Sequence, residues 1–149
     1  MVNIYILRLT QGKFYIGKTS NPTFRISSHF NLKGGAVWTN KYKPLNVVKI
    51  IKNCDDFDED KYTKMYMKRY GIDNVRGGSY VTENLMDSQK KLIHKELLCA
   101  SNRCYGCGKT GHFINNCNQK EKKESNQTLQ NNNLGNNQNT ENYFINEQE

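Results

Sequence analysis

Three segments rich in β-branched, aliphatic and aromatic residues predict the strands of a small sheet. They are VNIYILRL at 2–9, KFYIG at 13–17 and LNVVKIIK at 45–52. The loop TQG at 10–12 joins the first two segments, which makes them an antiparallel hairpin.

Helical spacing of apolar residues predicts three helices. The first begins at Pro22 and continues through TFRISSHF, and the third is DSQKKLIHKELL at 87–98. The second, at 58–70, has acids in its first turn, Lys and Arg in its last turn and Gly71 as its stop.

The element order ββαβαα predicts an α+β domain at residues 1–98. We expect a three-stranded mixed or antiparallel sheet with flanking helices. The segment DNVRGGSY, which precedes the last helix, reads as a loop.

The length of the hairpin loop decides whether Tyr5 and Tyr15 share a face. A two-residue QG turn would place the two tyrosines on opposite faces of the hairpin. A three-residue loop with Gly12 in the left-handed position would pair Leu7 with Tyr15 and place both phenols on one face. The position of Gly12 favours this second register.

Positive charge is concentrated in the first part of the chain. The net charge of the whole chain is +8, and residues 1–54 contain nine Lys and Arg residues but no Asp or Glu. Such a one-sign stretch favours a polyanionic partner, with a basic coding bias as the alternative. There is no long apolar run and no signal-peptide pattern, so we expect no membrane partner.

Three cysteines and one histidine near residue 110 have the spacing of a metal site. The pattern C-x2-C-x4-H-x4-C is formed by Cys104, Cys107, His112 and Cys117. Three thiolates and one imidazole complete a tetrahedral Zn²⁺ shell with no open position. Metal binding rather than disulfides implies a reducing intracellular compartment, the cytoplasm or the nucleus.

This zinc segment resembles the retroviral-type CCHC zinc knuckle, which binds single-stranded nucleic acid. The resemblance implies that Tyr105 and Phe113 form a stacking platform for an unpaired base of DNA or RNA. A purely structural zinc staple and a protein-binding knuckle are the alternatives. We expect a linker at 99–103, the knuckle at 104–117 and a disordered Asn/Gln-rich tail at 118–149.

Arg25 and His29 are four residues apart on the first helix, so they emerge on one face. The motifs NIY at 3–5 and YIG at 15–17, together with this pair and HFNLKGGAVWTNKYKP, resemble the GIY-YIG nuclease family. Asn3 stands where the family most often has Gly. The resemblance spans residues 2–80, and the fusion to a knuckle is similar to proteins of large DNA viruses, which would place the chain in a virus factory.

The family resemblance implies hydrolysis of a phosphodiester with one Mg²⁺ or Mn²⁺ ion. Tyr5 would orient or deprotonate the attacking water, and Tyr15 would support the site. Arg25 would neutralise charge on the phosphate, assisted by Lys18 and His29. Since a phenol is a weak base, we expect the cationic surroundings to lower its pKa.

The acidic run DDFDED supplies the candidate ligands for this ion. The family's metal-binding Glu aligns with Thr63, and Glu59 and Asp60 lie one turn earlier on the same helix. We expect Glu59 to bind the ion, with Asp60 as the second candidate. A plain helix-terminal charge cluster is the alternative for both, and Asn74 is either the family's late Asn or a turn residue.

These patterns predict a DNA endonuclease with a preference for branched or flapped substrates. The residues expected along the substrate path are Lys33, Trp38, Lys41 and Lys43, with Trp38 either stacking on a base or packing in the core. A non-catalytic nucleic-acid-binding adaptor on an inactive nuclease fold is the main alternative. A third is a protein-binding domain joined to an RNA-binding knuckle.

Overall fold

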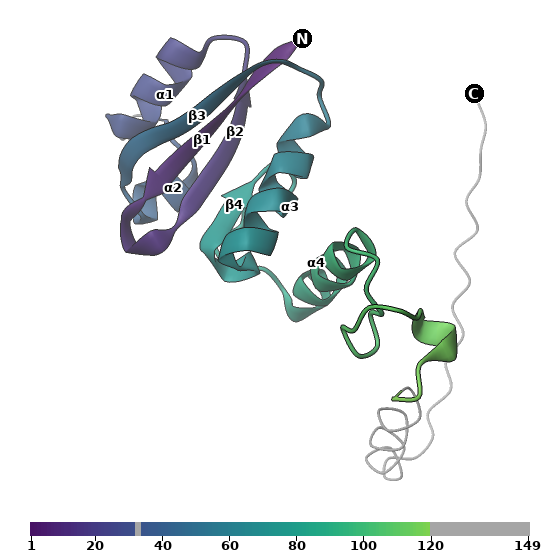
Figure 1. Ribbon diagram of the computed structural model, residues 1–149. Coiled ribbons are helices and arrows are strands. Elements are labelled where there is room, and N and C mark those ends of the chain that lie inside the picture. Colours follow the sequence, from purple (N-terminus) through teal and green to yellow (C-terminus); the bar gives the residue numbers. More distant parts are fainter. Residues whose placement is uncertain (32–33, 120–149) are drawn as a thin grey trace, which may run out of the picture. The chain divides into compact units, whose positions relative to one another are not determined.

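The computed structural model describes residues 1–31 and 34–119 (Figure 1). They fall into two compact units, one from Met1 to Arg103 and the other beginning at Cys104. The predicted linker at 99–103 lies within the first unit. Lys33 and nearly all of the predicted disordered tail lie outside the described residues. None of the described helices has the length and apolar character needed to cross a membrane.

The first unit contains a mixed sheet of four strands in the order β3-β1-β2-β4. The strands are β1 (Val2–Leu9), β2 (Phe14–Thr19), β3 (Pro44–Cys54) and β4 (Val75–Gly77). β1 pairs antiparallel with both β2 and β3, whereas β4 pairs parallel with β2. The predicted α+β class is confirmed, and the sheet has one strand more than the sequence predicts.

Four helices accompany the sheet. They are α1 (Pro22–Phe30), α2 (Val37–Lys41), α3 (Asp58–Tyr70) and α4 (Asp87–Cys99). The predicted helices α1, α3 and α4 are confirmed, and α3 ends at Gly71, whose φ of 97° stops the helix. Short α2 and β4 were not predicted, because neither has enough residues to show a helical or strand period.

The hairpin adopts the three-residue register. Leu7 pairs with Tyr15, and the backbone N–H of Leu9 donates to the carbonyl of Lys13 at 2.8 Å. The loop is a single 3-10 turn at Thr10–Gly12, with Gly12 at φ 69°. The register predicted from the position of Gly12 is therefore confirmed.

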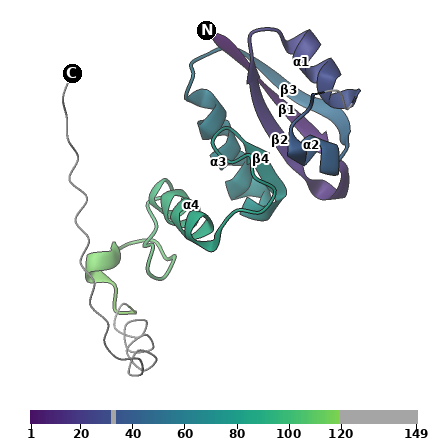
Figure 2. The ribbon, with the colours of Figure 1, turned by 180° about the vertical axis from the view of Figure 1, so that it is seen from behind.

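Alternation along β1 and β2 builds two apolar layers, one on each face of the sheet. Ile4, Ile6, Phe14 and Ile16 pack with Met67 of α3 and Ile93 of α4. On the other face Tyr5, Leu7, Leu9 and Tyr15 pack with Trp38 of α2 and Ile26 of α1. Figures 1 and 2 show α1 and α2 on one side of the sheet and α3 on the other. The tyrosines predicted to carry chemistry thus lie between the sheet and α1.

Candidate active site

Tyr5 and Tyr15 lie side by side beneath α1. Their ring centroids are 6.3 Å apart, and both rings lie within 6 Å of the His29 imidazole, at 5.6 Å for Tyr5 and 5.1 Å for Tyr15. The three residues come from two adjacent strands and one helix. The hairpin register and the four-residue spacing on α1 therefore bring together three of the predicted site residues.

Gly17 provides the space for the Tyr5 ring. The two residues are paired across β1 and β2, and a Cβ at Gly17 would collide with Cζ and Oη of Tyr5. Only glycine leaves room for the phenol at this point of the sheet. The glycine of the YIG motif thus fixes where the Tyr5 hydroxyl lies.

We expect Gly17→Ala to lower the free energy of unfolding by about 1–3 kcal/mol, because the added methyl group overpacks the site and displaces Tyr5. Urea denaturation measures this change. Gly12→Asn is the control, since no atom lies within 4 Å of a Cβ there and Asn tolerates its positive φ. Equal stability losses in the two variants would contradict the close fit of Tyr5 against Gly17.

A buried chain of hydrogen bonds runs from Tyr5 through His29 to α2. The Thr39 hydroxyl donates to the carbonyl of Ala36 at 3.0 Å, so its oxygen must accept from Nδ1–H of His29 at 2.9 Å. Nε2 of His29 is then the acceptor for the Tyr5 hydroxyl at 2.8 Å. This network assigns one tautomer to His29 and leaves Nε2 as a proton acceptor facing Tyr5.

The surroundings keep the His29 imidazole neutral. His29 is fully buried, and burial, aided by the charge of Arg25, lowers its pKa to about 4. A neutral imidazole is the form that can accept a proton from Tyr5.

The low pKa of His29 makes stability fall as the solution is acidified. Between pH 6.5 and 4 the unfolded state binds a proton that the folded state does not, so the contribution is complete above 6.5 and lost toward 4. We expect this group to remove roughly 3 kcal/mol over that window. Urea denaturation across this pH range should show a smaller loss of the free energy of unfolding in His29→Gln than in the natural chain. Identical losses would contradict the lowered pKa of His29.

Tyr5 and Tyr15 do not have the lowered pKa that the sequence predicts. Burial raises the pKa of both phenols, and the negative charges of Tyr15 and Glu59 add to the rise for Tyr5. The charge of Arg25 opposes this shift but does not reverse it. The expectation was wrong because desolvation of the buried phenolate outweighs the nearby positive charge. Tyr5 is therefore a phenol that donates a hydrogen bond.

Arg25 places a guanidinium group over the two phenols. It interacts with both tyrosines, and its Nη1 donates to the carbonyl of Gly34 at 3.2 Å. The residue as a whole is only partly buried.

Glu59 lies in the first turn of α3 and faces the same tyrosines, since its charge acts on the pKa of both. Burial raises the pKa of the Glu59 carboxyl, while the Lys18 ammonium and the backbone N–H of Gly78 favour its charged form. The charge of this half-buried carboxylate therefore acts on both phenols, while Lys18 of β2 and Gly78 after β4 lie next to it. Oxygen donors of this kind suit Mg²⁺ or Mn²⁺.

Asp60 is engaged elsewhere. Its two carboxylate oxygens accept from the backbone N–H and the hydroxyl of Ser79, at 2.7 Å and 2.8 Å. Thr63, at the position of the family's Glu, is fully buried and donates its hydroxyl to the carbonyl of Glu59 at 2.8 Å. Of the two candidate ligands on α3, Glu59 is the one whose charge acts on both tyrosines.

Other candidates have partners that were not foreseen. The Lys18 ammonium lies 3.6 Å from Asp56, and the Asn74 side chain accepts from Lys13 at 2.7 Å and donates to the carbonyl of Tyr70 at 2.7 Å. Asn74 therefore holds the turn after α3, which is the alternative that the sequence left open.

The predicted substrate path loses Trp38. Trp38 is 3% exposed, donates its indole N–H to the carbonyl of Phe14 and packs under the Arg76 guanidinium, so it is a core residue and not a stacking surface. Lys41 forms an exposed ion pair with Glu83, while Lys43 is exposed. Trp38 is buried because the short helix α2 turns it toward the sheet, which the sequence pattern does not reveal.

The second unit contains the predicted Cys/His cluster. The ligand atoms of Cys104, Cys107, His112 and Cys117 all lie within 4.8 Å of one another. Zinc–sulfur bonds of about 2.3 Å at tetrahedral angles bring the ligands of one ion about this close together, so the donor set fits zinc. Gly106 permits the approach, because a Cβ there would collide with Ile114. Beside the cluster, Tyr105 and Phe113 are 36% and 64% exposed.

The family comparison concerns the greater part of the first unit. Residues 1–70 match the family model of the GIY-YIG catalytic domain. Residues 1–70 are therefore similar to a GIY-YIG catalytic domain. The match runs from the first strand to the last residue of α3 and includes Tyr5, Tyr15 and Glu59. No curated protein and no solved structure matches the chain.

The match indicates a nuclease-type fold for residues 1–70, and sequence analysis missed two residues of the candidate site. Thr39 fixes the tautomer of His29, and Gly35 would bring a Cβ to 3.0 Å from the Thr39 hydroxyl and 3.3 Å from the imidazole. The pair Gly34-Gly35 is the one signal that could have indicated a close approach here. A third missed residue, Arg76, is 2% exposed and donates to four backbone carbonyls, those of Ile72, Val75, Thr82 and Glu83.

Proposed function

We propose that the chain is a metal-dependent endonuclease that hydrolyses phosphodiester bonds of DNA, with branched or flapped DNA as its preferred substrate. The observation that carries the proposal is the hydrogen bond of Tyr5 to a neutral His29, with Arg25 beside both tyrosines and Glu59 facing them. A proton acceptor, a cation for the phosphate and a carboxylate for a metal ion are thus grouped at one place. Hydrolysis of a phosphodiester needs these three functions.

Glu59 is the residue that would hold the divalent cation. A site of one carboxylate completed by substrate phosphate and water is typical of Mg²⁺, and GIY-YIG nucleases use divalent metals. When bound, the ion supplies positive charge that stabilises the phosphate as its bond breaks. Asp60 supports this site indirectly by holding the turn at Ser79.

Tyr5 and His29 move the proton of the attacking water. The Tyr5 oxygen accepts a proton from the water while its own proton passes to Nε2 of His29, so Tyr5 remains a phenol throughout. The water oxygen forms a bond to phosphorus, one phosphorus–oxygen ester bond breaks, and the leaving oxygen takes a proton from solvent. The hydrogen bond from Nδ1 to Thr39 orients the imidazole during this transfer.

Arg25 binds the scissile phosphate. Its guanidinium stands next to both phenols, so a phosphate paired with it lies beside the Tyr5 hydroxyl. The charge that accumulates on the phosphoryl oxygens then strengthens this contact as the reaction proceeds. Tyr15 packs against His29 and keeps the imidazole in place.

The Cys/His unit holds a single-stranded part of the substrate. Tyr105 and Phe113 flank the zinc ligands and expose ring surface on which an unpaired base stacks, as in a zinc knuckle. The structural zinc ion fixes the backbone that carries both rings. DNA and RNA strands both offer such bases.

One experiment separates an active nuclease from a non-catalytic binder. Labelled duplex, single-stranded and flap DNA are incubated with the full chain in Mg²⁺ or Mn²⁺, beside Arg25→Ala and its control Arg69→Ala. Arg69 is exposed at the far end of α3 from Glu59. We expect the natural chain to cleave flap DNA only when the metal is present. Arg25→Ala should abolish this cleavage, and Arg69→Ala should retain it. Binding without cleavage under both metals contradicts the proposal and supports the adaptor.

A further inference from the structure

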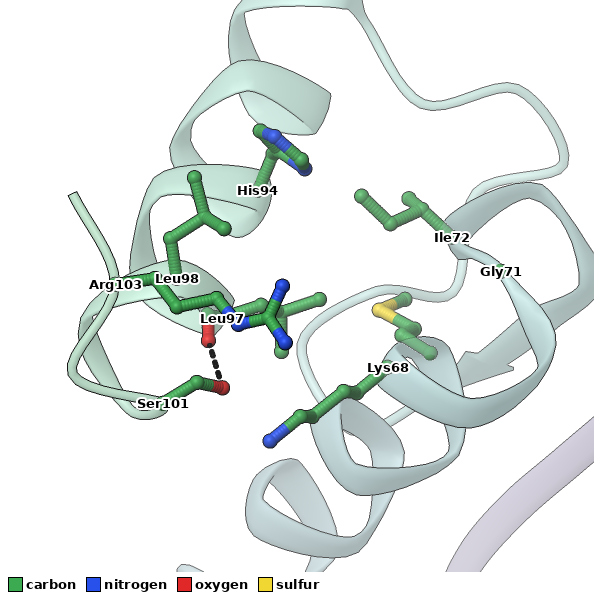
Figure 3. A pocket seen from close by; sticks show the side chains of 9 residues that line it. Lys68, Gly71, Ile72, His94, Leu97, Leu98, Ser101 and Arg103 are labelled. Atoms are coloured by element: carbon green, nitrogen blue, oxygen red, sulfur yellow. Dashed lines mark hydrogen bonds between the residues drawn. The ribbon is translucent and has the colours of Figure 1, made fainter. Parts of the chain in front are cut away.

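A pocket lies at the end of the GIY-YIG domain opposite to Glu59. It has a volume of about 490 Å³ and is lined by the last turn of α3, by Ile72 and by the last turns of α4 up to Arg103. Met67 belongs to its apolar lining, and Figure 3 shows Ile72 and Leu97 there, with the Arg103 guanidinium reaching across from the segment after α4. A volume of this size is within the range of small-ligand sites, about 300–1,000 Å³.

The ionisable side chains of the pocket are basic. Lys68, His94 and Arg103 belong to its lining, which contains no Asp or Glu. In the described parts of the chain, no ion pair or side-chain hydrogen bond engages Lys68 or Arg103. Two cationic groups therefore remain available beside an apolar wall.

The helix ends around the pocket do not offer free acceptors to compete for these cations. The carbonyl of Leu98 accepts the N–H groups of Ser101 and Arg103, both at 3.0 Å. The carbonyl of Leu97 accepts the hydroxyl of Ser101 at 2.9 Å, the bond drawn in Figure 3. The positive charges of Lys68 and Arg103 are consequently what an anionic ligand would complement.

We propose that this pocket binds one unpaired nucleotide of the DNA substrate, with the base against Met67, Ile72 and Leu97 and the phosphate between Lys68 and Arg103. The inference rests on the proposed nuclease function. A nucleotide combines a flat apolar ring with an anion, which matches one apolar wall and two neighbouring cations. A purely apolar ligand would leave both cations unpaired.

The distance between the pocket and the active site fits a single DNA strand that occupies both. Glu59 is in the first turn of α3 and Lys68 in its last turn, nine residues later. At 1.5 Å per residue this separation is about 13 Å along the helix. Four base steps of DNA at about 3.4 Å each cover the same length. The pocket would thus select substrates with an unpaired nucleotide a few positions from the scissile bond.

The test measures DNA binding by the full chain carrying Glu59→Gln, which keeps the DNA uncut. Fluorescence anisotropy compares flap and blunt duplex DNA for Lys68→Gln/Arg103→Gln and for the control Lys91→Gln/Arg69→Gln, which removes equal charge from exposed positions outside the pocket. We expect the pocket variant to bind flap DNA about tenfold more weakly and to lower the salt slope by about one. The control should stay within about twofold of the parent, and blunt duplex should be affected equally little in both variants.

Two further arms identify what the pocket holds. Abasic sugars at the flap should weaken binding by the parent but not by the pocket variant, because without the phosphate contact the variant no longer holds the nucleotide whose base packs on the apolar wall. If a free deoxynucleoside monophosphate displaces the flap, a single nucleotide is enough to occupy the pocket. If it does not, the nucleotide binds there only as part of a DNA strand. Equal flap binding by the pocket and control variants overturns the inference.

The outcomes also separate this inference from the proposed function. If the natural chain binds flap DNA through the pocket but never cleaves it, the nuclease proposal fails and the nucleotide pocket stands. If it cleaves flap DNA and the pocket variant cleaves as fast as its control, only the pocket fails. If no DNA is bound at all, both are overturned. Thermal unfolding of each variant verifies that the exposed substitutions leave the fold intact.

Discussion

Glu59→Gln is expected to lower the single-turnover rate of phosphodiester cleavage about a thousandfold in Mg²⁺. Loss of the charged carboxylate removes the group that would hold the ion, and several kcal/mol of charge stabilisation disappear with it. The amide keeps the size of the side chain, so the fold should be retained. Quenched-flow or manual time courses with excess protein over labelled flap DNA measure the rate.

Asp60→Asn is the matched control for Glu59→Gln. It also removes one negative charge from the first turn of α3, but its remaining oxygen can still accept a hydrogen bond from Ser79. We expect its cleavage rate to stay within about tenfold of the natural chain. If the two variants lose activity to the same extent, Glu59 is not the distinct metal ligand.

Removal of zinc is expected to unfold the Cys/His unit and to leave the GIY-YIG domain folded. Zinc contributes about 10–16 kcal/mol to the folding of comparable small sites, far more than residues 104–117 can gain from their own apolar contacts. The natural chain should contain one zinc ion by metal analysis. A chelator or Cys107→Ser should collapse the amide resonances of residues 104–117 into the random-coil region.

Trp38 provides the internal control for this experiment, because it is the single tryptophan of the chain and lies in the core of the first unit. Its fluorescence should not change when zinc is removed. The structural zinc site would be contradicted if the amide resonances of residues 104–117 did not change on chelation. It would also be contradicted by a purified chain that contains no zinc and still shows well-dispersed amide resonances for these residues.

Local rules were enough to predict half of the candidate active site. The position of Gly12 determines the hairpin register and thereby brings Tyr5 and Tyr15 to one face. The spacing of Arg25 and His29 on a helix that begins at Pro22 places both over that face. These relations depend on residues fewer than thirty positions apart and on the fixed periods of helices and strands.

The remainder depends on contacts that no local pattern encodes. Thr39 reaches His29 from the five-residue helix α2, and β4 joins the sheet through three residues that carry no strand signal. The pKa of Tyr5 rises because the surrounding layer excludes water, and the extent of that burial is a property of the assembled fold. The buried position of Trp38 was open in the sequence for the same reason.

The central claim is that the Tyr5 hydroxyl relays a proton to His29 during cleavage. Tyr5→Phe tests it most directly, because the variant removes one oxygen and keeps the packed ring against Gly17. The measurement is the single-turnover rate on flap DNA in Mg²⁺, taken together with the free energy of unfolding. We expect Tyr5→Phe to lower the rate about 10²–10⁴-fold and to change the free energy of unfolding by no more than about 2 kcal/mol. A folded Tyr5→Phe protein that cleaves at the natural rate would contradict it.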